Sequence, residues 1–159
     1  MRLRILLADD HVVMRQALRN LLETGADFEC TAECSSGTET VEAARYEKPD
    51  VAVVDISMPG RSGIDVTPEI LQHSPPTAVL ILSMHSDARY VVRAIKAGAL
   101  GYVLKTSVVD DLVMAIHAVH QRQTYFSPAV AEFARAGLAQ TSSPVDRTKN
   151  DPGMTGCDG

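Results

Sequence analysis

The sequence predicts an α/β protein in which a doubly wound parallel sheet is covered by helices on both faces. Short apolar runs alternate with amphipathic stretches five times between residues 3 and 122, a pattern typical of repeated strand–helix units. The run Val51–Val54 is apolar throughout and mostly β-branched, as expected of a strand buried on both faces. Pro59 and Gly60 then predict a loop. These observations place Asp55 at the carboxyl end of a central strand.

The predicted elements follow one another in a regular order. Apolar runs predict strands at Leu3–Ala8, Phe28–Glu33, Val51–Asp55, Ala78–Ser83 and Gly101–Lys105. Apolar residues at helical spacing predict helices at His11–Glu23, Thr38–Glu47, Ile64–His73 and Asp87–Ala97. Ser107–Asp110 matches a capping box and predicts that a fifth helix begins there. Pro68 predicts that the third helix is short or bent.

The second strand is predicted to lie near the edge of the sheet, because polar and apolar residues alternate along it. Cys30 and Cys34 are separated by an even number of positions, so we expect both on the same side as buried, reduced thiols. The sequence has three cysteines, which fit neither a disulfide framework nor a zinc ribbon. A reducing, cytoplasmic location is the simplest expectation.

Composition and charge exclude several classes of function. The net charge of −5 gives no overall basic surface for nucleic acid or for an anionic membrane. We expect no signal peptide and no membrane span, because no apolar run approaches the roughly 20 residues that cross a bilayer. Ser127 and Pro128 match the start of a helix that continues to Gln140. Residues 141–159 are rich in Ser, Thr, Pro, Gly and Asp and predict a disordered tail.

Polar residues follow four of the five predicted strands. They are Asp9 and Asp10 after the first strand, Asp55 after the third, Ser83 after the fourth and Lys105 after the fifth. In a parallel sheet of the flavodoxin-like order 2-1-3-4-5, these strand ends lie on one edge, and the first and third strands are neighbours. Three converging carboxylates repel one another unless a cation intervenes, and oxygen ligands suit Mg²⁺.

A nucleophilic carboxylate, a lysine and a divalent ion together form an electrostatic clamp for a phosphoryl group during its transfer. The chain resembles the receiver domains of two-component response regulators, which have the CheY-like fold. The resemblance covers roughly residues 3 to 122. It is carried by Asp9-Asp10, Asp55–Gly63, Ser83 and Gly101–Lys105. Leu7–His11 and Tyr125–Val130 resemble the LuxR-type (NarL-type) subfamily in particular. Thr106 departs from the family, which commonly has proline there.

The resemblance implies a role for each matching residue. It makes Asp55 the phosphoacceptor, Lys105 the phosphate-binding cation and Ser83 the switch hydroxyl, with Tyr102 as the switch aromatic. It implies a Mg²⁺ site, with Mn²⁺ as an alternative ion, whose ligands would be Asp9, Asp10, Asp55 and the backbone carbonyl of Ser57. Ser57 and His85 occupy positions that tune the lifetime of the phosphate. The chain would act as a phosphoacceptor rather than an enzyme, with at most self-phosphorylation and self-dephosphorylation.

The resemblance also predicts domains and partners. Residues 1–122 would form the receiver domain, 123–140 a linker helix and 141–159 the tail. The partner would be a cognate histidine kinase. A homodimer would use either the face of the fourth helix, fifth strand and fifth helix or the first and fifth helices. The subfamily continues into a DNA-binding helix-turn-helix domain that this chain does not show. We therefore expect a receiver part of a transcriptional regulator with no DNA contact of its own and no membrane contact.

The sequence is also compatible with other functions. A stand-alone receiver, or an adaptor that is never phosphorylated, would act through protein–protein contacts. A phosphohydrolase with an aspartyl nucleophile is disfavoured, because it usually needs an acid two residues after the nucleophile, where this chain has Ser57. A flavodoxin-like nucleotide binder is disfavoured because Asp9 and Asp10 repel phosphate unless a metal is bound.

Overall fold

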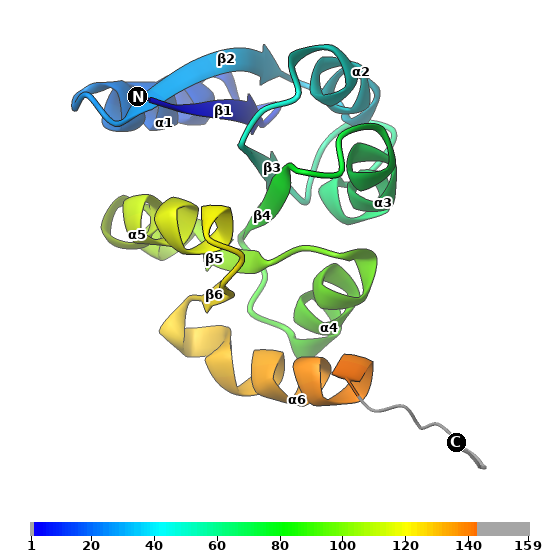
Figure 1. The fold of residues 1–159 in the computed structure, drawn as a ribbon. Coiled ribbons are helices and arrows are strands. Elements are labelled where there is room, and N and C mark those ends of the chain that lie inside the picture. The colour runs from blue at the N-terminus through cyan, green and yellow to red at the C-terminus, as the bar shows by residue number, and fades with distance from the viewer. Residues whose placement is uncertain (1, 143–159) are drawn as a thin grey trace.

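One parallel sheet of six strands, in the order β2-β1-β3-β4-β5-β6, organises the computed structural model (Figure 1). The structure describes residues 2–142, with side chains described as far as residue 138. The strands are β1 (Leu3–Ala8), β2 (Phe28–Cys34), β3 (Val51–Asp55), β4 (Ala78–Ser83), β5 (Gly101–Leu104) and β6 (Tyr125–Phe126). The helices are α1 (Val12–Glu23), α2 (Gly37–Glu47), α3 (Gly63–His73), α4 (Ala88–Ala97), α5 (Val108–His120) and α6 (Ala131–Ser142), with short 3₁₀ turns η1 (Lys105–Ser107) and η2 (Pro128–Val130).

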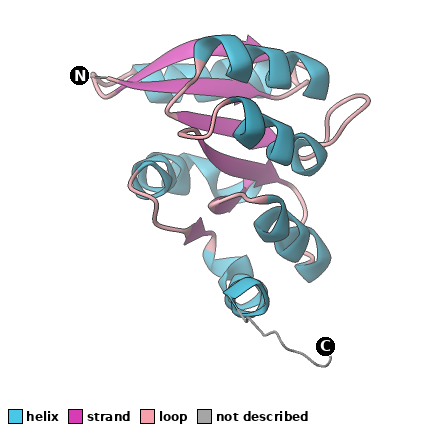
Figure 2. Cartoon of the chain, turned by 45° about the vertical axis from the view of Figure 1, so that its right-hand side comes forward, coloured by secondary structure: helices cyan, strands magenta, loops and turns pink. Residues whose placement is uncertain are grey.

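The sheet lies between two layers of helices (Figure 2). Helices α1 and α5 cover one face, where they form a core with the odd-numbered residues of β1 and β3. Helices α2, α3 and α4 cover the other face. Because β3 is covered on both sides, Val51–Val54 have no exposed surface, as the continuous apolar run predicts. The doubly wound α/β fold is confirmed.

The sheet has six strands, so the prediction of five strands was one short. Strand β6 pairs with β5 through Gly101↔Tyr125 and Tyr102↔Phe126. The absence of a side chain at Gly101 leaves room for this approach, since a methyl group there would crowd Leu80 and the Tyr125 carbonyl. A strand of two residues is too short to show the alternation by which strands are predicted.

Strand β2 contains an irregularity that changes where its cysteines point. The register with β1 shifts between Ile5 and Leu6, so that Thr31 is an extra residue in β2. Beyond it the side chains change sides: Cys30 packs with the core under α1 and α5, whereas Cys34 belongs to the core on the opposite face. The prediction that both thiols share one side was wrong, because even spacing holds only in a strand without a bulge.

Three of the helices begin at side-chain caps. Ser36, Ser62 and Asp87 accept hydrogen bonds from backbone amides at the starts of α2, α3 and α4. Helix α3 runs for 11 residues despite Pro68, so the proline does not shorten it. The capping box predicted at Ser107 is absent, because its hydroxyl donates instead to Asp111, one turn into α5.

Helix α6 packs along α4 (Figure 1). Val130 and Ala134 are fully buried in the core on the α4 side of the sheet. The 3₁₀ turn η2 precedes α6, so the helix starts at Ala131, slightly later than the sequence predicts, and it continues beyond Gln140 to Ser142. The tail predicted at 141–159 lies outside the described residues except for 141 and 142, which belong to α6. Among residues 2–142 we find no helix with the length and apolarity that crossing a membrane requires.

Candidate functional site

Three strands bring their charged ends to one edge of the sheet. Strands β1 and β3 are neighbours, with Ala8 opposite Val54, so Asp9 and Asp55 lie next to each other. Lys105 leaves the end of β5 and places its Nζ 3.0 Å from Asp9 Oδ2 and 3.0 Å from Asp55 Oδ2. The lysine side chain is only 6% exposed, and both aspartates are almost fully buried. The structure thus brings together Asp9, Asp55 and Lys105 as the sequence predicts.

The two carboxylates and the ammonium group perturb one another. Burial raises the pKa of Asp55, and the negative charge of Asp9 adds to that rise, while Lys105 opposes it. Burial alone would lower the pKa of Lys105, but its contacts with Asp9 and Asp55 outweigh burial and raise it. The lysine is therefore a fixed positive charge beside a carboxylate that is reluctant to ionise.

Asp10 and His11 extend the site toward solvent. The Asp10 side chain is 31% exposed, and the His11 ring Nδ1 lies 3.3 Å from Asp10 Oδ1 and 3.2 Å from Asp9 Oδ1. Asp9 Oδ1 also accepts a hydrogen bond from the His11 backbone amide at 2.9 Å. Sequence reasoning did not include His11 in the site, although its position directly after the acidic pair could have indicated it.

The donor atoms of this cluster fit a divalent cation. Ligand atoms of Asp9, Asp10, His11 and Asp55 all lie within 4.8 Å of one another. Within the described part of the chain, the buried oxygens Asp9 Oδ2 and Asp55 Oδ2 have Lys105 Nζ as their one polar side-chain partner, and Asp10 Oδ1 has only the His11 ring. One lysine next to three carboxylates also leaves a formal charge of −2, which a divalent ion would balance. The Asp cluster is therefore compatible with a metal site.

The loop after β3 holds Asp55 in place. The Ser57 amide donates a hydrogen bond to Asp55 Oδ1 at 3.3 Å, and the Ser57 residue itself is exposed. Gly63, at the start of α3, donates from its amide to the Ile56 carbonyl at 3.1 Å. A side chain at Gly63 would collide with the Asp55 carbonyl and with Val54. Close packing of α3 therefore fixes the backbone at the candidate phosphoacceptor.

Ser83 and Tyr102 are both linked to the backbone of His85. Ser83 ends β4, the neighbour of β3, and its buried Oγ accepts a hydrogen bond from the His85 amide at 2.8 Å. The Tyr102 hydroxyl donates to the His85 carbonyl at 2.7 Å, and burial raises the pKa of this phenol. The His85 ring stacks on Tyr90, with the ring centres 4.3 Å apart. The β4–α4 loop therefore connects both candidate switch residues.

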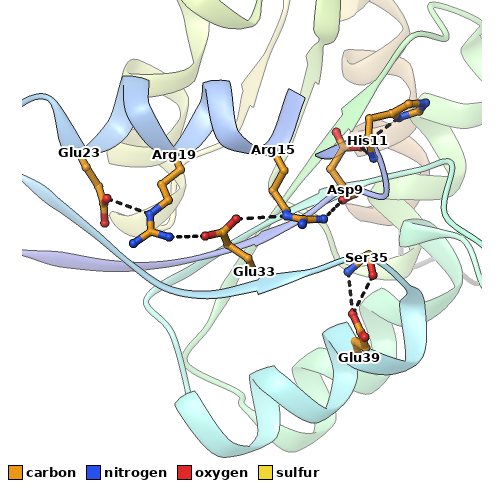
Figure 3. A network of polar contacts seen from close by, with 8 residues as sticks. All are labelled: Asp9, His11, Arg15, Arg19, Glu23, Glu33, Ser35 and Glu39. Atoms are coloured by element: carbon orange, nitrogen blue, oxygen red, sulfur yellow. Dashed lines mark hydrogen bonds and ion pairs between the residues drawn. The ribbon is translucent and has the colours of Figure 1, made fainter. Parts of the chain in front are cut away.

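A chain of ion pairs supports the Asp9 backbone from outside the site (Figure 3). Arg15 Nη1 donates to the Asp9 carbonyl at 2.7 Å, and Arg15 Nε pairs with Glu33 on β2 at 3.2 Å. Glu33 also pairs with Arg19, which in turn pairs with Glu23. This network joins α1, β2 and the acidic loop. The sequence did not predict it, because Glu33, which joins the two arginines, lies 18 residues from Arg15 and 14 from Arg19.

An apolar pocket of about 480 Å³ opens beside Lys105. Its lining residues are His11, Val13, Met14, Ala17, Met84 and Lys105. Val13 on α1 is 81% exposed and Met84 in the β4–α4 loop is 66% exposed, so the rim of the charged site is apolar. Exposed apolar side chains that border a charged site favour a protein-binding surface.

The sequence pattern of the family described as "Response regulator receiver domain" matches residues 5–117. The chain belongs to this family. It is 38% identical over 124 residues to the oxygen regulatory protein NreC of Staphylococcus epidermidis, a match that covers 77% of this chain and 57% of NreC. It is 36% identical over 129 residues to the transcriptional regulatory protein DegU of Brevibacillus brevis, covering 81% of this chain and 55% of DegU.

Solved structures give the same result for the fold of this receiver domain. A two-component response regulator of the LuxR family from Aurantimonas sp. SI85-9A1 superposes with a TM-score of 0.80 at 33% identity, over 87% of this chain and 99% of that one. The signal receiver domain of the putative regulator NarL from Mycobacterium tuberculosis gives a TM-score of 0.72 at 29% identity, over 76% of this chain and 97% of that one. The predicted resemblance to LuxR-type and NarL-type receivers is confirmed. The chain spans a little over half the length of NreC and DegU.

Proposed function

We propose that this receiver domain accepts a phosphoryl group on Asp55 from a histidine kinase, in a Mg²⁺-dependent reaction in the cytoplasm, as the input part of a transcriptional response regulator. The observation that carries the proposal is the position of Lys105 Nζ, 3.0 Å from both Asp9 and Asp55. The lysine offers a positive charge where the phosphoryl oxygens would develop negative charge. Like other receivers, the domain would act as a signalling module rather than as an enzyme with turnover.

In the proposed transfer, an oxygen of Asp55 attacks the phosphorus of a phosphohistidine. The P–N bond breaks, the imidazole leaves with its electron pair and takes up a proton, and an aspartyl phosphate forms. Asp9, Asp10, Asp55 and the Ser57 carbonyl would hold Mg²⁺, or Mn²⁺ in its place, and the bound ion would supply charge neutralisation for the phosphoryl oxygens. Ser57, exposed next to Asp55, and His85 would influence how quickly water removes the phosphate.

The switch would run through Ser83. A phosphoryl oxygen on Asp55 would accept a hydrogen bond from the Ser83 hydroxyl, since strands β3 and β4 are adjacent, and drawing Ser83 toward it would strain the hydrogen bond that Ser83 Oγ accepts from the His85 amide. Tyr102 is already fully buried, and its hydroxyl donates to the His85 carbonyl. A shift of the β4–α4 loop would therefore change this hydrogen bond without a large rotation of the Tyr102 ring. The α4 surface would change as a result.

The apolar pocket supports a protein as phosphoryl donor. Asp55 is almost fully buried, so a donor must approach across the rim formed by α1 and the β4–α4 loop. Val12, Val13 and Met84 are exposed there and suit an apolar helix face of a kinase. For a homodimer, the surface of α1 and α5 is better supported than the α4–β5–α5 face. Helix α6 covers part of α4, while Val109 and Met114 on α5 are exposed.

The test is incubation of the chain with acetyl phosphate and Mg²⁺, followed by intact mass measurement. We expect one phosphoryl adduct, which does not form when a chelator is present from the start and is absent in Asp55→Asn. Asp110→Asn, which changes an exposed aspartate at the start of α5, is the matched control and should keep the adduct. An adduct on Asp55→Asn, or none on the wild type, contradicts the proposal.

A further inference from the structure

His11 is the only nitrogen donor in the acidic cluster described above, within the part of the chain that the structure describes. It precedes the first residue of α1, and its ring is 66% exposed, so an ion in solution can reach it. Its Nδ1 lies 3.2 Å from Asp9 Oδ1 and 3.3 Å from Asp10 Oδ1. The ring therefore points toward the carboxylate oxygens rather than away from them.

These separations match neighbouring ligands of one ion. Adjacent ligands in an octahedral site with bonds of about 2.1–2.2 Å lie about 3.0–3.1 Å apart, so small adjustments would place Nδ1 in the same shell as the two oxygens. The cluster also contains Asp10 Oδ1 and the deeply buried Asp9 Oδ2 and Asp55 Oδ2, and Lys105 is the one cation that pairs with the two buried oxygens in residues 2–142. Arg15 holds the Asp9 backbone, which keeps the acidic loop in position.

We propose that His11 Nδ1 is an additional ligand at this centre and that it biases the centre toward first-row transition ions over Mg²⁺. Imidazole nitrogen suits the later first-row ions such as Co²⁺ and Zn²⁺, whereas Mg²⁺ prefers oxygen and water. The inference rests on the proposed function in one respect, which is that both place a metal ion on the same aspartates. It concerns metal binding, which is measured without any phosphoryl transfer.

The test compares the affinities of Co²⁺ and Mg²⁺ for the full chain by titration calorimetry. We expect His11→Asn to weaken Co²⁺ binding by about tenfold or more and to change Mg²⁺ binding by less than about twofold. The matched control is His120→Asn, at an exposed position near the end of α5, which should change neither affinity. Circular dichroism of each variant establishes that the fold is kept.

Spectroscopy of bound Mn²⁺ provides a direct readout of the bond. Pulsed electron paramagnetic resonance should detect a directly coordinated nitrogen in the wild type and in His120→Asn, and none in His11→Asn. If His11→Asn weakens both ions equally, or neither, or if the wild type shows no nitrogen coupling, the proposal is overturned. These results are independent of acetyl phosphate labelling: if Asp55 is not phosphorylated, the proposed function fails while the metal assignment stands or falls by these measurements.

Discussion

Lys105 Nζ lies 3.0 Å from Asp55 Oδ2, and the same nitrogen lies 3.0 Å from Asp9 Oδ2. One ammonium group therefore links the carboxyl ends of β1, β3 and β5, which are distant in sequence. Both aspartates are almost fully buried, so neither can exchange this partner for water. The lysine should consequently matter for stability as well as for chemistry.

Replacing Lys105 with Met should destabilise the fold by about 3 kcal/mol, because two buried carboxylates lose their cation. Millimolar Mg²⁺ should recover more stability in this variant than in the wild type, since the ion restores positive charge. Urea unfolding monitored by circular dichroism measures both effects. The exposed Lys96→Met is the control. Equal stability of the two variants would refute the structural role of Lys105.

Asp55→Asn should stabilise the protein at pH 7 and raise its Tm above that of the wild type. The pKa of Asp55 is raised in the folded state, chiefly by burial, so folding favours the protonated form. The stability this group contributes is present below its unfolded pKa and is lost as pH rises through the folded pKa. The asparagine side chain does not ionise, so the variant does not lose this stability as the pH rises. Lys105 keeps Asp9 as its partner in the variant.

Thermal unfolding of the wild type and Asp55→Asn between pH 3.5 and pH 7.5 tests this directly. The difference in Tm should be small at the acidic end and should grow as pH rises above about 3.8, the ordinary pKa of the group. A difference that shrinks with rising pH would mean that the carboxylate is favoured by folding.

Gly63→Ala should destabilise the protein by more than about 2 kcal/mol, because a methyl group there meets the Asp55 carbonyl and Val54 in the central strand. Gly25→Ala is the matched change, since nothing lies near the added methyl group and the backbone at Gly25 does not have positive φ. Urea unfolding of both variants gives the comparison. Similar losses at the two positions would show that α3 does not pack closely against β3.

Tyr102→Phe should lower stability by about 1 kcal/mol while keeping the ring in the core, because the hydrogen bond to the His85 carbonyl is lost. Tyr46→Phe changes a tyrosine that is 76% exposed and should have almost no effect. Thermal unfolding compares the pair. An unchanged Tm in Tyr102→Phe would mean that the β4–α4 loop does not depend on this contact.

Cys30 and Cys34 should react slowly with a disulfide reagent at pH 8 in the native protein. Burial raises the pKa of Cys30 to about 12 and that of Cys34 to about 11, so little thiolate is present. A Cys157→Ser background isolates these two thiols, and the urea-unfolded chain provides the fast reference rate. Rapid formation of a Cys30–Cys34 disulfide in the native protein would contradict their placement on opposite faces.

The strands that form the site were predictable because they are buried on both faces. The bounds of β1 at Leu3–Ala8 and of β4 at Ala78–Ser83 agree with the sequence prediction to the residue, since mostly apolar runs bounded by polar residues have sharp ends. Once these strands lie in parallel, the topology alone brings Asp9, Asp55 and Lys105 to one edge. The arrangement of these residues follows from the pattern, while their chemical roles remain predictions.

Features that depend on a single inserted residue or a single side-chain contact were not predictable. Thr31 is a residue type that is common in regular strands. As the extra residue of β2, however, it moves the side chains that follow it to the opposite faces of the sheet. Ser107 has the sequence of a cap, but Asp111 competes for its hydroxyl. His11 looks like an ordinary helix-start residue until its ring is seen between two carboxylates. Each of these outcomes is decided by strand pairing or by side-chain contacts rather than by local propensity.

The pairing of β6 with β5 has a practical consequence for how the domain is cut. A chain ending at Arg122, where the sequence places the receiver boundary, would lose Tyr125–Phe126 and leave the backbone of β5 as an open border of the sheet. It would also uncover the apolar surface of α4 on which Val130 and Ala134 lie. Unpaired strand borders invite other chains to add to them, so such a fragment should self-associate and precipitate more readily than one extended through α6.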